Sequence, residues 1–152
     1  MEISDGGIML IKKWESYRPE AYPDPASVDG KPVTCGYGST RKLNGSPFVI
    51  GDRLTNVEAS ELLRIQIRDY EKVITDNVKT KLTQNQFDAL TSFVYNLGGR
   101  TFLNSTLKKK IDINPLDLDI AAEFIKFKNA SGKPFRGLLL RRLEEAIMYF
   151  TK

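Results

Sequence analysis

The chain has 152 residues, a length that suits one domain or one domain in two lobes. Its 41% hydrophobic content is typical of a folded globular protein, and a chain of this size buries roughly 70% of its unfolded surface. The net charge of +4 is compatible with an anionic partner such as nucleic acid or bacterial cell wall, and equally with solubility alone. No apolar run approaches the ~20 residues that span a bilayer, so we expect no stable membrane insertion.

The sequence restricts the kinds of reactive side chain. It contains no histidine and a single cysteine, Cys35. This composition excludes an internal disulfide, histidine general bases, Ser-His-Asp triads and metal sites built from histidine or cysteine. We interpret Cys35 as a small core hydrophobe. Any chemistry must use carboxylates, hydroxyls, lysine or backbone groups, and we expect no metal and no cofactor.

The first residues predict a helix that ends close to an acid. Ser4 can cap this helix and Ile3 can pack onto Ile8, after which apolar residues follow at helical spacing as far as Trp14 and Glu15. Two prolines shortly afterwards forbid further helix. The acids precede the short apolar run, which is the reverse of a secretory signal, so we expect the chain to begin in a cytoplasm.

A small β-lobe follows, at about residues 15–54. The segment 19–52 is rich in Pro, Gly, Ser and Asp, and it contains two short β-like runs at 33–37 and 46–50. Asn44-Gly45 is a hairpin-type turn.

The rest of the chain predicts helices. Capping boxes at 55–58 and 83–86 open a long connecting helix, about 55–76, and a second helix that Gly98-Gly99 stops. Three further helices are expected at 105–111, 115–128 and 137–150. The predicted class is α+β, mainly α, in one domain of residues 1–152, with a helical lobe of about 80–152 plus the N-terminal helix. A cleft is expected where two such lobes meet.

Three polar residues between positions 15 and 34 suggest glycoside hydrolysis. Glu15 ends a helix beside Trp14, which fits a protonated general acid, because apolar neighbours and the helix C-terminus both disfavour an ionised carboxylate. Asp24 lies in a polar turn and fits an ionised partner, and Thr34 could hold a water. Two plainer interpretations stay open: a surface glutamate that ends a helix, and an aspartate that forms a turn between prolines.

Several motifs resemble the phage-type lysozymes, which are endolysins of the glycoside hydrolase family that includes the coliphage lysozymes. Glu15 and Asp24 have the family offset, 24 − 15 = 9, and the segment TCGYGST begins at Thr34. The segments LTQNQFDALTSFVYNLG, FLNSTLKKK, AAEFIKF and GLLLRRLEEA are similar to the family's later helices. The resemblance covers essentially the whole chain, and it implies a lysozyme-like bilobed fold with a substrate cleft.

The resemblance also implies an activity. The enzyme would be a lysozyme, an N-acetylmuramidase that hydrolyses the β-1,4 bond between N-acetylmuramic acid and N-acetylglucosamine in peptidoglycan, with inversion. Glu15 would be the general acid, Asp24 would activate or position the water or stabilise positive charge on the sugar, and Thr34 would hold the water.

Further positions match residues around the family's groove. Gly38 and Tyr95 match positions that line it, with Asn96 adjacent. A basic position near the catalytic Glu is matched by Arg141. Tyr95 could equally be a core aromatic, and Arg141 could equally be a surface charge that pairs with Glu144 or Glu145.

Three departures from the family pattern stand out. The segment between Asp24 and Thr34 has nine residues, 34 − 24 − 1 = 9, which is longer than usual and lets Asp29 compete for the catalytic role. Ser39 stands where the family often has His, and Cys35 stands where an apolar residue is usual.

The expected partner is the glycan strand of peptidoglycan. By analogy with the family, a monomer would accumulate in the host cytoplasm and depend on a holin, a membrane-hole protein, to reach the wall. Alternatives are a lytic transglycosylase of similar fold and a non-catalytic cell-wall-binding module. A nucleic-acid binder is disfavoured because the basic residues are spread, apart from 108–110 and 141–142.

Overall fold

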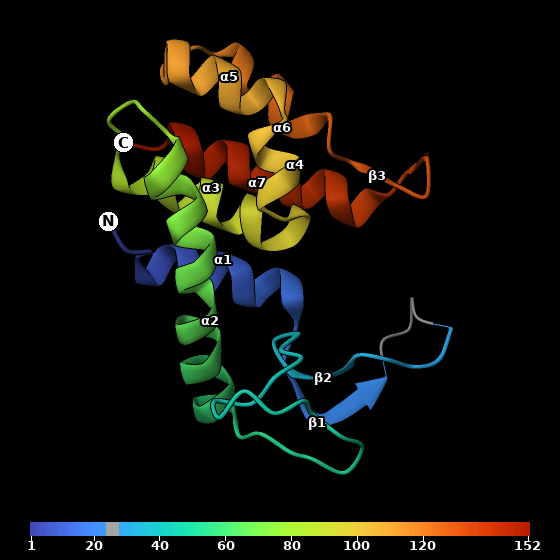
Figure 1. Cartoon of the computed structure of the whole chain (residues 1–152). Helices are drawn as coiled ribbons and strands as arrows, with labels where there is room; N and C mark the ends of the chain where they lie inside the picture. The colour runs from blue at the N-terminus through green and yellow to red at the C-terminus, as the bar shows by residue number, and fades with distance from the viewer. Residues whose placement is uncertain (24–27) are drawn as a thin grey trace. The chain divides into compact units, whose positions relative to one another are not determined.

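The computed structural model describes residues 1–23 and 28–152 (Figure 1). It is mainly helical, as predicted. The helices are α1 Asp5–Glu15, α2 Asn56–Asn77, α3 Gln84–Leu97, α4 Gly99–Leu103, α5 Thr106–Ile113, α6 Asp119–Ile125 and α7 Arg136–Phe150. The strands are β1 Arg18–Pro23, β2 Val33–Gly36, β3 Asn129–Ala130 and β4 Lys133–Pro134. The chain forms two compact units, one of residues 11–67 and one of residues 1–10 and 68–152.

The predicted helix starts are confirmed by their caps. The Ser4 hydroxyl accepts from Gly7 N at 3.3 Å at the start of α1. Thr55 and Glu58 form a reciprocal pair before α2, with the Thr55 hydroxyl donating to Glu58 Oε2 at 2.8 Å. The second capping box, Thr83 with Gln86, opens α3. Each box satisfies backbone N–H groups that the first turn of a helix leaves without a partner.

The strand predictions are correct only in part. β2 lies within the predicted run 33–37, but its partner is the antiparallel strand β1, which we did not predict. The predicted strand at 46–50 is wrong: this segment contributes only an isolated bridge between Arg41 and Pro47, next to the Asn44-Gly45 turn. The two prolines of β1 stop helix but are tolerated in a short exposed edge strand.

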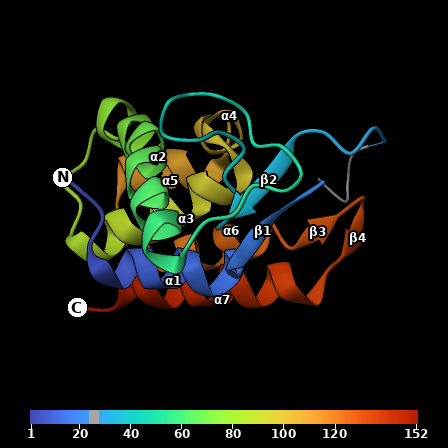
Figure 2. The same ribbon diagram turned by 90° about the horizontal axis from the view of Figure 1, so that it is seen from below.

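The later helices differ from prediction mainly at their ends. α3 stops before Gly98 as expected, but a new short helix, α4, begins at Gly99. The predicted helix 115–128 is reduced to α6, because the Asn114 and Asp117 side chains accept backbone N–H groups two residues on and form turns there. Figure 2 shows β3 and β4 as a hairpin before α7, in the segment between the last two predicted helices.

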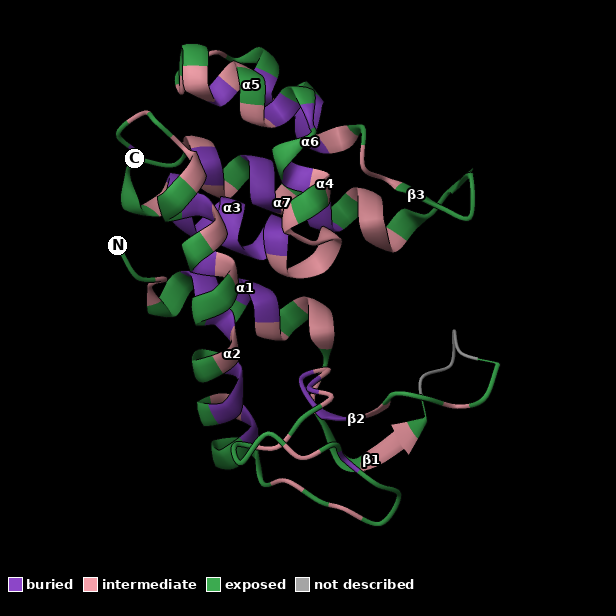
Figure 3. Ribbon diagram, in the orientation of Figure 1, coloured by how far each residue is buried: buried purple, intermediate pink, exposed green. Residues whose placement is uncertain are grey.

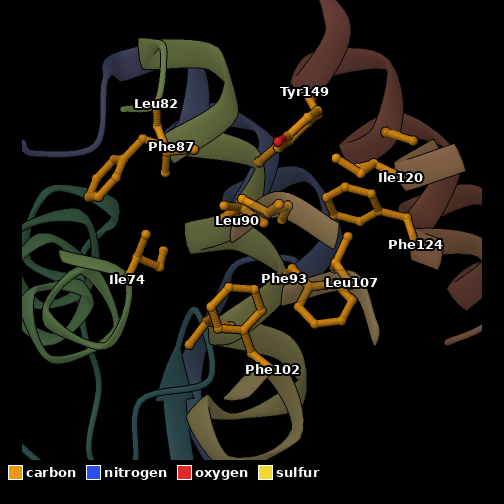
Figure 4. Packing of buried hydrophobic residues seen from close by; sticks show 14 residues of the cluster. Ile74, Leu82, Phe87, Leu90, Phe93, Phe102, Leu107, Ile120, Phe124 and Tyr149 are labelled. Atoms are coloured by element: carbon orange, nitrogen blue, oxygen red, sulfur yellow. The ribbon is translucent and has the colours of Figure 1, made fainter. Parts of the chain in front are cut away.

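The core of the unit 1–10 and 68–152 is built around α3. Buried residues follow one another along this helix, because it packs against several others, including α7 (Figure 3). Phe93 lies at the centre of the cluster in Figure 4. Its ring meets those of Phe102, Phe124 and Phe127 edge to face, with centroids 5.0–6.2 Å apart. This is a favoured geometry for aromatic pairs.

The unit of residues 11–67 has a smaller core. Cys35, Phe48 and Leu62 are buried together, with Ala21 and Leu54 partly buried against them. Cys35 is a core residue, as predicted. Burial raises the pKa of its thiol, which keeps it in the less reactive protonated form.

The N-terminal segment is held by two buried acids. Ile3 N donates to Glu71 Oε1 at 2.6 Å, and Ser4 N donates to Asp88 Oδ1 at 3.0 Å. The Ser4 hydroxyl also bonds to Asp88. These contacts bring the start of α1 close to α3 at Gly7, where an added Cβ would lie 2.5 Å from Ile3 Cγ1 and 2.9 Å from Asp88.

Gly7→Ala is therefore expected to destabilise the fold by about 1–3 kcal/mol, because the new methyl group has no room beside Ile3 and Asp88. Gly6→Ala is the matched control. An added Cβ there meets only Ser4 Oγ, at 3.4 Å, so this helical substitution should stabilise by roughly 0.4–1 kcal/mol. Urea unfolding of both variants makes the comparison, and equal effects would contradict the predicted clash.

Candidate active site

Glu15 is the last residue of α1, and it is half-buried. The chain leaves the helix at Ser16, whose φ of 57° is unusual for a residue other than glycine. It then enters β1 at Arg18. The predicted acid thus lies at the junction of a helix and a strand, as expected from the sequence.

The end of α1 is held by Lys12, which precedes Glu15 by one helical turn. Lys12 Nζ donates to Ser60 Oγ at 2.7 Å and lies 5.2 Å from the centre of the Tyr37 ring. The Tyr37 hydroxyl in turn accepts from Asn56 Nδ2 at 3.1 Å. These contacts join α1 to the first turns of α2 and to the Gly-Tyr-Gly turn.

The chain on the other side of Glu15 is anchored to the same region by Tyr17. The Tyr17 hydroxyl donates to Leu54 O at 2.6 Å, and its ring lies 5.7 Å from that of Tyr37. Sequence reasoning missed both Lys12 and Tyr17. The spacing of Lys12 from Glu15 was the available signal, because residues three apart share a helix face.

Thr34 lies in β2 opposite Tyr22 and is only 9% exposed. Its hydroxyl lies 3.4 Å from Tyr22 O, a long contact that leaves the oxygen lone pairs able to accept. Gly38, four residues on, is half-buried and has a φ of 86°, a conformation that favours glycine.

The turn that contains Gly38 is closed by reciprocal backbone hydrogen bonds between Cys35 and Ser39, of 2.9 and 3.0 Å. Gln66, on α2, secures the turn from outside. Its Oε1 accepts from the Ser39 hydroxyl at 2.8 Å, and its Nε2 donates to Arg41 O at 3.1 Å. Ser39 therefore replaces the family's frequent His with a buried hydroxyl that helps to hold the turn.

Asp24 and Asp29 are the two candidate partner acids. Asp24 lies outside the described residues. Asp29 is exposed, and its Oδ1 accepts from Lys31 N at 3.1 Å, which closes a local turn. Asp29 and Lys31 also line a hollow of about 810 Å³ together with the segment 47–50.

The remaining predicted site residues belong to the unit 1–10 and 68–152. Tyr95 and Asn96 lie in the last turn of α3 and are half-buried. The Tyr95 ring packs edge to face on Tyr70, with centroids 5.1 Å apart. Asn96 Oδ1 accepts from Arg142 Nη2 at 3.0 Å. Tyr95 is thus neither wholly core nor wholly surface.

Arg141 is not a surface charge, because it is only 3% exposed. That part of the alternative interpretation is wrong, but the pairing with Glu145 that it named is present as a buried contact, with Nε 3.2 Å from Oε1. The same carboxylate accepts from Ser92 Oγ at 2.7 Å and lies 2.8 Å from Arg142 Nε. Burial raises the pKa of the Glu145 carboxyl, while Arg142, Arg141 and the Ser92 hydroxyl act in the opposite direction.

Comparison with known proteins identifies relatives over the full chain. The Phage lysozyme family matches residues 12–145. An endolysin of Acyrthosiphon pisum secondary endosymbiont phage 1 is 38% identical, with 98% of each chain covered. A crystal structure of a P22 lysozyme mutant matches with a TM-score of 0.88 at 32% identity, covering 99% of both chains. The muramidase domain of SpmX from Asticaccaulis excentricus matches with a TM-score of 0.85 at 28% identity.

These matches and the mainly helical fold with its small sheet define a glycoside hydrolase of the lysozyme class. The chain belongs to the phage lysozyme family, as the sequence motifs predicted. It is a peptidoglycan-hydrolysing endolysin.

Within residues 1–23 and 28–152, no group of three or more His, Cys, Asp or Glu side chains is placed to hold a metal ion. None of the helices in that part of the chain has both the length and the apolar character needed to cross a bilayer.

Ser92→Ala is expected to destabilise the protein by about 1–3 kcal/mol, because it removes one hydrogen-bond donor from the fully buried Glu145 carboxylate. Thr91→Val is the neighbouring control. The Thr91 hydroxyl donates only to Phe87 O within its own helix, so its loss should cost less, about 0.5–1.5 kcal/mol or below. Urea unfolding at neutral pH measures both, and a larger loss for Thr91→Val would count against the carboxylate network.

Proposed function

We propose that Glu15 is the general acid of this endolysin, that Asp24 is the carboxylate that activates the attacking water, and that Thr34 holds this water. The observation that carries the proposal is the placement of Glu15. It ends α1, and Lys12 and Tyr17 anchor the chain on both sides of it to the region of the Gly-Tyr-Gly turn. A catalytic acid needs this kind of support from its surroundings.

The proposed reaction is hydrolysis of the β-1,4 bond between N-acetylmuramic acid and N-acetylglucosamine. Glu15 gives its proton to the glycosidic oxygen as the bond to the anomeric carbon breaks. Water attacks that carbon from the opposite face and loses a proton to Asp24, so the configuration inverts. Water in solution then restores the starting protonation of both acids. Neither a metal nor a cofactor takes part.

The glycan would be held by Gly38, Tyr95 and Asn96, with Arg141 in support. The half-buried state of Tyr95 and Asn96 favours this role, since such side chains are fixed on one side and reach the surface on the other. The left-handed backbone at Gly38 keeps the turn free of a side chain, which allows a sugar close approach.

We also propose that the enzyme is a monomer that waits in the host cytoplasm until a holin opens the membrane. This route rests on analogy with the family, and two relatives at 30–32% identity are named SAR-endolysin. Expression in a Gram-negative host gives a test. Lysis is expected only when a permeabilising agent is added, and lysis without it would contradict the route.

Glu15→Gln is expected to lower the rate of peptidoglycan hydrolysis by at least about 10²-fold, since it removes the proton donor. It should leave the fold at least as stable, because an active-site acid is kept for function. The assay is clearing of purified Gram-negative peptidoglycan, with mass spectrometry of the products and thermal unfolding of each variant. Hydrated reducing muramic ends are expected from the wild type.

The matched control is Glu61→Gln, which changes an exposed glutamate of the same unit and should keep full activity. Asp24→Asn and Asp29→Asn separate the two candidate partner acids, and only the first should abolish hydrolysis. Anhydro ends with a mild Asp24→Asn effect would identify a transglycosylase. A folded wild type that clears nothing would point to a binding module.

A further inference from the structure

The Asn96 side chain is held by an arginine that is itself immobile. Arg142 is fully buried, with 0% exposure. Its Nε lies 2.8 Å from Glu145 Oε2, and its Nη2 donates to Glu145 Oε1 at 3.0 Å. The guanidinium also lies 5.1 Å from the centre of the Phe93 ring. The hydrogen bond to Oε1, the close ion pair with Oε2 and the Phe93 ring face together hold this group in place.

The contact between Arg142 and Asn96 fixes which end of the amide faces the arginine. Arg142 Nη2 lies 3.0 Å from Asn96 Oδ1. A guanidinium has five donors and no acceptor, so the amide atom that faces it must be the oxygen. The reverse orientation would set donor against donor. The amide nitrogen of Asn96, with its two N–H donors, is therefore turned away from Arg142.

The charge on Arg142 also affects the strength of this donor. A cationic donor on the amide oxygen polarises the whole amide group, and hydrogen bonds in such chains strengthen one another. Asn96 thus presents a strengthened donor from a half-buried position at the end of α3. The group that suits it best is a neutral oxygen that can only accept.

Among the groups on the sugar rings of peptidoglycan, the acetamido carbonyl oxygen is the strongest neutral acceptor that carries no donor, because the ring and glycosidic oxygens are weaker, ether-type acceptors. Hydroxyl groups can also accept, but they donate as well, so a donor of fixed polarity does not select for them. Removal of the acetyl group leaves an ammonium, which would place donors against the donors of Asn96. A site with this polarity should therefore discriminate strongly between acetylated and de-N-acetylated glycan.

We propose that Arg142 and Glu145 are positioning residues that hold Asn96 as a dedicated hydrogen-bond donor to the acetamido carbonyl of a glycan sugar. This inference rests on the proposed function, in which Asn96 contacts the glycan. It adds a role for the buried cluster, namely selection of N-acetylated peptidoglycan. Arg142 and Glu145 do not touch substrate but act through the orientation of one amide.

The test compares kcat/KM on N-acetylated peptidoglycan with kcat/KM on the same material after chemical de-N-acetylation. Asn96→Asp is the decisive variant. One carboxylate oxygen can still accept from Arg142, while the other accepts where the amide donated and can pair with the ammonium of the de-N-acetylated sugar. We define the ratio as kcat/KM on N-acetylated material divided by kcat/KM on de-N-acetylated material. In Asn96→Asp this ratio should fall by on the order of tenfold or more, which corresponds to the loss of one hydrogen bond.

The matched control is Asn114→Asp, an exposed asparagine of the same unit whose Oδ1 accepts from Leu116 N. An aspartate can accept that bond equally well, so the ratio should equal that of the wild type. Equal losses of Asn96→Asp on both substrates would overturn the proposal. If Asn96→Asp does not fold, Asn96→Ala must lower the ratio instead, and an unchanged ratio there overturns it too.

A third substrate shows whether the acceptor is the acetamido carbonyl or a carbonyl of the stem peptide. On glycan stripped of its peptides, the effect of Asn96→Asp on the ratio should persist. If the effect disappears, the acceptor of the Asn96 amide is a carbonyl of the stem peptide, and the proposal is overturned. Ser92→Ala loosens the Glu145 carboxylate and should lower the ratio modestly. A folded Ser92→Ala with an unchanged ratio would overturn the positioning role of Glu145.

The result of this selectivity test can be distinguished from the result of the test of the proposed catalytic function. A wild type without hydrolytic activity, or full activity in Glu15→Gln, would defeat the proposed function. An active wild type whose selectivity ignores Asn96 would defeat only the present inference.

Discussion

The carboxylate of Glu145 is the interaction on which the organisation of the helical unit depends. It is fully buried, and it joins Arg141 and Arg142 of its own helix to Ser92 on α3. Removing a carboxylate and two guanidinium groups from water is costly, and the cost is offset only when every partner is in place. The arrangement therefore tolerates little relative movement of α3 and α7, and Asn96 extends this fixed geometry to the end of α3.

In the unit of residues 11–67, weaker and more exposed contacts hold the candidate acid Glu15. One ammonium, Lys12, and two tyrosines hold the chain around Glu15 through a hydroxyl, a ring face and a backbone carbonyl. Each contact is modest, but they act on both sides of Glu15 within a few residues. Two short anchors close to a functional group restrict it more effectively than a distant large core, because less chain lies between them.

The helical part of the fold was predictable because its signals are local. Ser4, the capping boxes and Gly98 act on neighbouring backbone groups, so the sequence states where α1, α2 and α3 begin or end. Strand β1 was not predictable in the same way. Its prolines indicate the end of regular structure, and its pairing with β2 depends on residues ten to eighteen positions away in the sequence. Periodicity within one run carries no information on such a partner.

In the candidate site, too, features with local sequence signals were predictable, and features that depend on distant packing were not. The spacing of Glu15 and the TCGYGST segment pointed to the residues, and the end of α1 falls at Glu15 as expected. The burial of Arg141, Arg142 and Glu145 could not be foreseen. Four charged residues within five positions normally mark the solvent face of a helix, and the packing of α7 against α3 encloses three of these four.

The local structure around Asp29 bears on the choice between the two partner acids. Asp29 Oδ1 accepts from Lys31 N and so closes the turn in which the residue lies. A carboxylate that activates water takes up a proton, and protonation at Oδ1 would weaken the hydrogen bond that closes this turn. Its exposure also leaves its charge screened by solvent, which weakens any influence on a sugar cation. Both points favour the proposed assignment of the partner acid to Asp24, which keeps the family offset from Glu15, over an assignment to Asp29.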